Sequence, residues 1–249
     1  MSETARMWVE IIFNVSYLIT VCALVIAMLR RQGNVPASQQ PLTRALILAF
    51  ALLALGDMGH VGFRVIAYAM GSLEATIPLL GRDIGLVGLG ALSTATTVTV
   101  FYVLVLVIWR KRFDKAYGWF GILLFAAAAV RLVIMAFPQN QWGRTTPPAG
   151  WSLVRNAPLM LQGLGVAYLI LRNAATAHDR AFTKIGWMII VSYTFYTPVI
   201  LFVQRVPMLG MLMIPKTMAY VAIAWIGYTQ LFPHAVSTPV APVVTANAD

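Results

Sequence analysis

The stretch Gly56-Asp57-Met58-Gly59-His60-Val61-Gly62-Phe63-Arg64 decides how this chain folds, because it sets polar side chains inside an apolar segment. That segment runs from about residue 43 to residue 70, which is long enough to cross a bilayer as one helix. A carboxylate, an imidazole and a guanidinium are costly in hydrocarbon unless they face a polar interior. The stretch therefore predicts one wall of a functional cavity.

Helical spacing brings the polar residues of this stretch onto one side. Asp57, His60 and Arg64 fall at i, i+3 and i+7, so they share a narrow stripe. Gly59 and Gly62 point roughly the opposite way, and their missing side chains would let a neighbouring helix approach closely. We expect the two glycines to mark a helix contact behind the polar stripe.

The composition is that of a membrane protein with several spans. Of the 249 residues, 60% are apolar and 10% are charged, and the mean hydropathy is +0.79, whereas soluble domains average about 25% charged residues. We predict an all-α integral membrane protein with a seven-helix transmembrane domain over residues 1–233 and a short disordered cytoplasmic tail over 234–249. The predicted spans lie near residues 7–29, 43–70, 85–109, 116–138, 152–173, 183–204 and 208–232.

Basic residues are distributed unequally between the connections on the two sides of the membrane, and this predicts how the chain is oriented. The first, third and fifth connections and their flanks hold Arg30, Arg31, Arg44, Arg110, Lys111, Arg112, Lys115, Arg172, Arg180 and Lys184. The other side holds mainly Arg6, Arg82, Arg144 and Arg205. The positive-inside rule then predicts a multi-pass protein of the cell (inner) membrane, with its N-terminus outside and its C-terminus in the cytoplasm.

The same distribution bears on partners. Basic loops beside a membrane face anionic lipid, so we expect membrane lipids as partners and no nucleic acid, despite the net charge of +10. The connections are too short for a soluble domain, so a receptor function would require a separate signalling partner. A homo-oligomer is also left open.

Further polar residues lie toward the outer ends of later spans. Arg131 either faces inward or extends to the outer headgroups, and both readings stay open. Pro158 is compatible with the start of a helix, which predicts that Arg155 and Asn156 lie at or just below the outer surface. Lys216 is about two turns deep, and we expect it to face inward.

These residues favour an anionic ligand. The cations of the outer half have only Asp57 and Glu10 as clear acidic partners, and guanidinium and ammonium groups bind carboxylates and phosphates well. We therefore expect binding or transport of a small anionic or amphiphilic ligand, with Asp57 and His60 relaying a proton. The expected ligand-binding residues are Arg64, Arg131, Arg155, Asn156, Tyr193, Tyr196, Lys216 and Tyr220.

Asp57 and His60 are residue types that also serve two other kinds of chemistry. As general acid and base they would make the chain a membrane-embedded enzyme acting on a lipid, so whether it is an enzyme stays open. A metal site is not expected, because no second histidine lies in any predicted span. The single cysteine, Cys22, excludes an intramolecular disulfide.

The chain also resembles the microbial opsins. The resemblance covers the length, the predicted orientation, the late Lys216, and Trp187, Tyr196 and Pro198 on the sixth span. It implies a sensor or photoreceptor that carries retinal as a Schiff base on Lys216; no other cofactor is expected. The third span departs from the family, because it has no carboxylate between Gly85 and Trp109, where opsins have an arginine and paired aspartates.

Overall fold

The computed structural model describes residues 3–79, 82–144 and 148–233, so the predicted tail at 234–249 lies outside the described residues. The chain is an all-α bundle in which seven helices are long and apolar enough to span a membrane, as predicted. They are α1 (Glu3–Arg31), α2 (Gln40–Ala69), α3 (Leu86–Phe113), α4 (Gly118–Ala136), α5 (Ala149–Thr176), α6 (Arg180–Phe202) and α7 (Met213–Leu231).

Local sequence signals account for several helix ends. Pro41 lies in the first turn of α2, where its missing N–H removes no helical hydrogen bond. The Asp179 carboxylate caps α6 by accepting hydrogen bonds from the backbone N–H groups of Ala181 and Phe182, both at 3.1 Å. Asp114, with φ of 48°, ends α3 in the left-handed region. These three helix ends therefore follow from local sequence signals.

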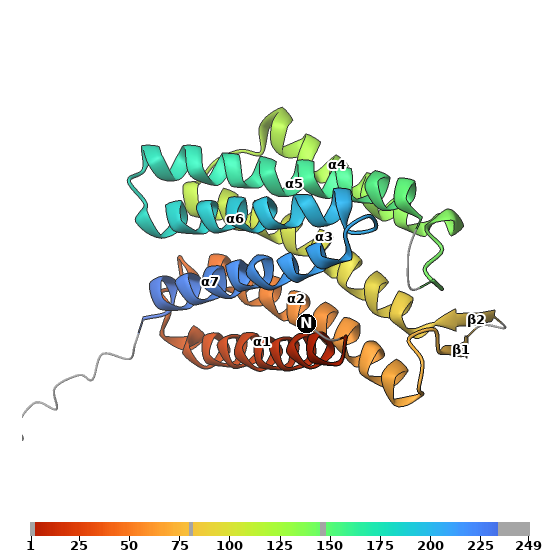
Figure 1. Cartoon of the computed structure of the whole chain (residues 1–249). Coiled ribbons are helices and arrows are strands. Elements are labelled where there is room, and N and C mark those ends of the chain that lie inside the picture. The colour runs from red at the N-terminus through yellow and green to blue at the C-terminus, as the bar shows by residue number, and fades with distance from the viewer. Residues whose placement is uncertain (1–2, 80–81, 145–147, 234–249) are drawn as a thin grey trace, which may run out of the picture.

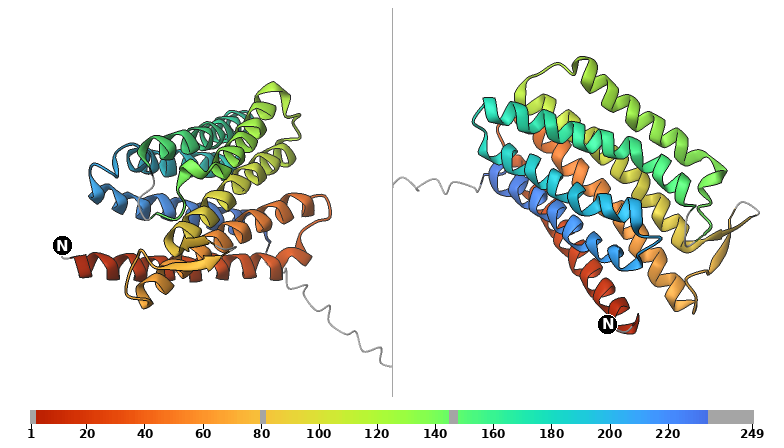
Figure 2. Two further views of the ribbon diagram at one scale, coloured as in Figure 1. Left: turned by 90° about the vertical axis from the view of Figure 1, so that its right-hand side faces the viewer. Right: turned by 45° about the horizontal axis from the view of Figure 1, so that its top comes forward.

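The helices form a ring with one helix outside it (Figure 1). Around the ring, α1 contacts α2, α2 contacts α3, α3 contacts α5, α5 contacts α6, α6 contacts α7, and α7 contacts α1. Helix α4 packs on α3 and α5 from outside. The second panel of Figure 2 shows α4, α5, α6 and α7 as neighbouring rods, and in Figure 1 α2 and α3 slope across the direction that α1, α5, α6 and α7 share. Because α3 contacts α2, α4 and α5, it ties the two sides of the bundle together.

The two ends of the bundle differ in charge. The α1–α2, α3–α4 and α5–α6 connections share one end, here called the basic end (Figure 1). It carries Arg30 and Arg31 in the last turn of α1 and Arg110, Lys111 and Arg112 in the last turn of α3. The other end, called the cavity end below, carries the α2–α3, α4–α5 and α6–α7 connections (Figure 1).

The α2–α3 connection contains a hairpin that the sequence reading did not predict. Strands β1 (Thr76–Leu79) and β2 (Arg82–Gly85) pair antiparallel, with Thr76 opposite Gly85, and project from the cavity end (Figure 1). Three short 3-10 segments complete the connections: η1 (Gln32–Asn34), η2 (Pro138–Asn140) and η3 (Pro207–Leu212). The last predicted span is thus divided, because its first residues form η3 and α7 begins at Met213.

Glycine lets α2 and α3 pack very closely, but the pattern differs from the prediction. A Cβ built on Gly56 would lie 1.8 Å from the Thr97 hydroxyl oxygen, and one on Gly59 would lie 2.6 Å from that of Ser93. From the other helix, a Cβ on Gly90 would lie 2.9 Å from the Cα of His60. Gly62 meets no atom within 4 Å, so the expectation of a helix contact at that glycine was wrong.

Candidate functional site

A cavity of about 420 Å³ opens among the helices at the cavity end. All seven helices line it, together with Trp142 from the α4–α5 connection and Gly210 and Met211 from η3. Nine of the ten residues singled out from the sequence are among its lining residues: Asp57, His60, Arg64, Arg131, Arg155, Asn156, Tyr196, Lys216 and Tyr220. The fold therefore gathers these side chains from α2, α4, α5, α6 and α7 around one space.

The Asp57 carboxylate is held by two neutral donors. The Tyr17 hydroxyl on α1 donates to Oδ2 at 2.7 Å, and the Thr94 hydroxyl on α3 lies 3.2 Å from Oδ1. Thr94 also lies 3.0 Å from the backbone carbonyl oxygen of Gly56, so it is fixed against α2. Within the described part of the chain, no cation lies within 4 Å of this carboxylate. The sequence suggested that Asp57 balances the charge of nearby cations, but Asp57 forms no direct ion pair with a described residue.

His60 sits where α2 and α3 are closest. The backbone of His60 lies against Gly90, which leaves no room for a side chain on α3 at that level. Its Nδ1 atom is buried and has no hydrogen-bond partner among the described residues. No hydrogen bond in that part of the chain joins His60 to Asp57. A proton relay between the two remains a prediction.

Arg131 faces the interior, which decides between the two readings left open by the sequence. Its side chain is 2% exposed, so it does not extend to the headgroup region. Nε donates to the backbone carbonyl of Arg155 at 3.0 Å, and Nη1 donates to the carbonyl of Ala95 at 2.9 Å and to the Thr99 hydroxyl. All three partners are neutral, so the described residues leave the charge of Arg131 without a carboxylate.

Arg155 and Asn156 are buried within the bundle. They lie in the first two turns of α5, which begins at Ala149, and Pro158 follows them inside the helix. Their depth relative to the membrane surface stays a prediction. Arg155 is 8% exposed, its Cζ lies 4.4 Å from the centroid of the Trp142 ring, and its Nη1 has no hydrogen-bond partner among the described residues. This guanidinium is stacked on an aromatic ring, and its Nη1 is buried without a hydrogen-bond partner among the described residues.

Asn156 connects the two arginines to α6. Its Oδ1 lies 3.5 Å from Nη2 of Arg131 and 3.4 Å from the Tyr196 hydroxyl. Both distances are long for hydrogen bonds. The amide is therefore close enough to orient Arg131 and Tyr196 without binding either tightly.

Lys216 faces inward, as the sequence predicts, and is held by aromatic rings. Its Nζ lies 4.7 Å from the centroid of the Tyr196 ring and 5.4 Å from that of Tyr220. At these distances the ring faces attract the ammonium group. Lys216 has no carboxylate within 4 Å among the described residues.

Tyrosines close the cavity on the side that faces the basic end. The hydroxyls of Tyr220 and Tyr102 lie 2.8 Å apart, and Tyr193 packs on Tyr102 with ring centroids 5.7 Å apart. Tyr193 donates to the backbone carbonyl of Leu159 at 2.9 Å and does not line the cavity. Tyr193, which the sequence predicted to bind the ligand, therefore does not contact the cavity. It packs behind the tyrosines that close it.

The lining carries an excess of positive charge. Arg64, Arg131, Arg155 and Lys216 line the cavity, with Asp57 as the one carboxylate among the described lining side chains. The side chain of Glu10, the other acidic partner considered from the sequence, lies outside those described. The described side chains contain no cluster of three histidine, cysteine or acidic residues able to hold a metal ion.

Sequence reasoning missed Tyr17 and Trp142, which complete the site. Tyr17 is a hydroxyl-bearing residue in the middle of an apolar span, and that contrast is a signal for an inward-facing position. Trp142 resembles an ordinary interfacial tryptophan in the sequence, so nothing there marks it as the partner of Arg155.

No protein-family model matches the chain, and neither the curated proteins nor the solved structures searched contain a match.

Proposed function

We propose that the chain binds a small anionic or amphiphilic molecule in the cavity, and that it carries this molecule across the membrane or holds it there. The observation that supports this most strongly is the pair of buried guanidinium groups, Arg131 and Arg155, on the lining. Neither has a carboxylate within 4 Å among the described residues.

Buried positive charge without a counter-ion is costly, because the protein interior solvates an ion less well than water. An anion in the cavity would offset this cost and could accept a charge-assisted hydrogen bond from the free Nη1 of Arg155. Lys216, held between the Tyr196 and Tyr220 rings, offers a third positive group from the α7 side. The lining thus favours a carboxylate or phosphate group over a neutral or cationic one.

The rest of the lining favours an apolar body on the ligand. Leucine, valine and isoleucine side chains also line the cavity: Leu53, Val61, Val98, Leu159, Val199, Ile200, Val203 and Ile214. A volume of about 420 Å³ is within the range of small-molecule sites. An organic anion with an aliphatic or ring portion fits both properties.

For orientation, we propose that the basic end faces the cytoplasm of a cell inner membrane, with the N-terminus and the cavity end outside. The support is the ten-to-four distribution of basic residues in the sequence, which follows the positive-inside rule. The ligand would then enter from outside. Reaction of each membrane face with an impermeant cysteine reagent, at cysteines introduced into the η2 and α5–α6 segments, tests this orientation.

Native mass spectrometry of the protein purified in a neutral detergent tests the binding proposal. We expect a co-purified anionic mass that is retained by Arg205→Gln and lost by Arg155→Gln. Arg205 is the matched control, because it is an exposed arginine beside α6 that does not line the cavity. Retention of a neutral or cationic molecule, or equal loss in both variants, would contradict an anion site.

Two time-resolved measurements separate transport from the enzyme alternative. Proteoliposomes should take up the identified ligand faster than protein-free vesicles if the chain transports it. If the bound molecule is instead converted during incubation, the mass spectrum will show a product accumulating with time. Equal uptake with and without protein would exclude transport of that ligand.

A further inference from the structure

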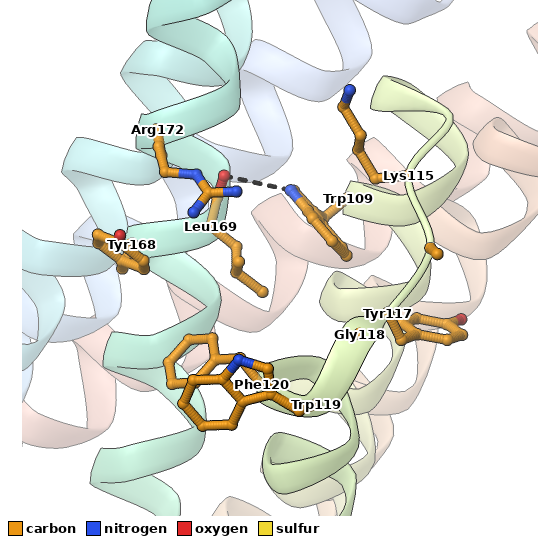
Figure 3. A pocket seen from close by; sticks show the side chains of 10 residues that line it. Trp109, Lys115, Tyr117, Gly118, Trp119, Phe120, Tyr168, Leu169 and Arg172 are labelled. Atoms are coloured by element: carbon orange, nitrogen blue, oxygen red, sulfur yellow. Dashed lines mark hydrogen bonds between the residues drawn. The ribbon is translucent and has the colours of Figure 1, made fainter.

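A second pocket lies at the basic end, remote from the cavity, where the α3–α4 connection meets α5 (Figure 3). Its volume is about 440 Å³. Trp109 near the end of α3, Lys115 in the α3–α4 connection, Trp119 and Phe120 from the start of α4, and Tyr168 and Arg172 from α5 line it. It shares no lining residue with the cavity.

This pocket has a charged part and an aromatic part. Figure 3 shows Arg172 and Lys115 on opposite walls at one end of the pocket, and Trp119 and Phe120 at the other end. Both cations are exposed, and neither forms an ion pair with a described residue. Arg172 lies 5.9 Å from the centroid of the Tyr168 ring, so its aliphatic stem and charge lie along the aromatic wall.

Hydrogen bonds and an ion pair join the elements that surround the pocket. The indole N–H of Trp109 is close to two acceptors on α5, the backbone carbonyl of Leu169 at 3.1 Å and Oδ1 of Asn173 at 3.0 Å (Figure 3). Nearby, Arg112 pairs with Asp179 at 2.7 Å and ties the end of α3 to the α5–α6 connection. These contacts hold the end of α3 against α5 at the base of the pocket.

The aromatic part continues into an exposed apolar surface. Trp119 is 77% exposed and Tyr168 is 54% exposed, and Ile122 on the next turn of α4 is also largely exposed. On a helix apolar enough to span a membrane, such side chains face lipid chains. The pocket thus joins a cationic rim to a lipid-facing surface.

We propose that this pocket binds an anionic phospholipid, with the headgroup phosphate at the end that carries Lys115 and Arg172 and an acyl chain along Trp119 and Tyr168. The two exposed cations at this end attract the phosphate, and the aromatic end matches the glycerol and upper chain. A free phosphate would leave the aromatic half of the pocket unused, so the geometry favours the lipid. This inference does not rest on the function proposed for the cavity.

Native mass spectrometry with defined lipids tests the proposal. Protein delipidated in a neutral detergent is titrated with phosphatidylglycerol, with phosphatidylcholine of the same chains, and with phosphatidylglycerol plus millimolar inorganic phosphate. We expect one tightly held phosphatidylglycerol, and a Lys115→Gln/Arg172→Gln variant that binds it roughly 30-fold more weakly, or roughly fivefold for each single variant.

The matched control is Arg180→Gln/Lys184→Gln, which removes two exposed cations from the same end of the bundle but outside the pocket. It should bind phosphatidylglycerol within twofold of the wild type. An equal loss in both double variants would show general attraction to the basic end and overturn the site. Equal binding of the two lipids, or displacement of phosphatidylglycerol by inorganic phosphate, would also overturn it.

Discussion

The Nε–H of Arg131 donates to the backbone carbonyl of Arg155 at 3.0 Å, which joins the two buried guanidinium residues of the cavity into one unit. Their roles differ. Arg131 uses its donors on the protein, whereas Arg155 rests on Trp142 and keeps Nη1 unpartnered among the described residues. This difference separates a residue that organises the site from one that is available to a ligand.

We predict that Arg131→Gln destabilises the protein more than Arg155→Gln. Glutamine at position 131 cannot reach the carbonyls of Arg155 and Ala95 and the Thr99 hydroxyl together, and a buried acceptor without a donor costs about 1–3 kcal/mol. Thermal unfolding in detergent should show a midpoint lower by about 2–4 °C per kcal/mol. Arg155→Gln should stay within about 1 kcal/mol of the wild type and lose its ligand. Equal destabilisation by the two substitutions would contradict the division of roles.

Packing between α2 and α3 gives a second prediction, with its control on the same helix pair. Gly90→Ala places a Cβ 2.9 Å from the His60 Cα and 3.1 Å from its carbonyl oxygen, and backbone atoms cannot yield as a side chain can. We expect a loss of about 1–3 kcal/mol.

Gly62→Ala is the matched control for the Gly90 substitution, because its Cβ meets no atom within 4 Å. It should be neutral or slightly stabilising, since alanine favours a helix by about 1 kcal/mol over glycine. Thermal unfolding of both variants checks the pair. A similar fall for both would mean that the close approach at Gly90 does not limit stability.

Some features of the structure follow from local sequence patterns, whereas others depend on contacts between residues far apart in the chain. Apolar length alone determines the seven helices, because any run that can fill the bilayer must satisfy its own backbone. The inward direction of Lys216 also follows from local reasoning, since the sequence places it about two turns from the end of its span, where the side chain would extend only partway to the headgroups. The hairpin at Thr76–Gly85 did not follow, because it depends on cross-strand pairing instead of on a local pattern.

The site could be predicted only in part, because the sequence does not show how each helix is rotated or which side chains reach it from other helices. Gly59 and Gly62 are equivalent in sequence, but only Gly59 faces α3. The sequence placed Arg155 in the first turns of the fifth span, close to where α5 begins, but it could not show that the rotation of α5 buries this side chain in the bundle. Tyr17 reaches Asp57 from another helix, and no spacing within α2 can reveal such a partner.

Lys216 distinguishes anion binding from the opsin-like alternative. If its charge holds an anion, Lys216→Arg should keep most of the affinity, while Lys216→Met should lose about tenfold or more, the value of a charged hydrogen bond. Isothermal titration with the identified ligand measures both. A Schiff base with retinal requires the primary amine, so that alternative predicts visible absorbance on adding retinal and its loss in both variants.

A substitution at Asp57 distinguishes ligand binding from transport most clearly. Both donors to its carboxylate, Tyr17 and Thr94, are neutral hydroxyls, so the isosteric Asp57→Asn variant can keep its packing and at least one hydrogen bond. Removing a negative charge from the lining should leave anion affinity unchanged or tighter, because the carboxylate and the ligand repel each other. If Asp57 relays a proton, uptake into proteoliposomes should collapse in the same variant.

Tyr17→Phe is the control for the Asp57 substitution, because it removes one hydrogen bond and leaves the carboxylate charged. It should bind the ligand within twofold of the wild type and retain measurable uptake. Weaker binding in Asp57→Asn would instead mean that the carboxylate holds a positive group of the ligand. Undiminished uptake in that variant would remove Asp57 from the proton path, and leave the buried Nδ1 of His60 as the next group to test.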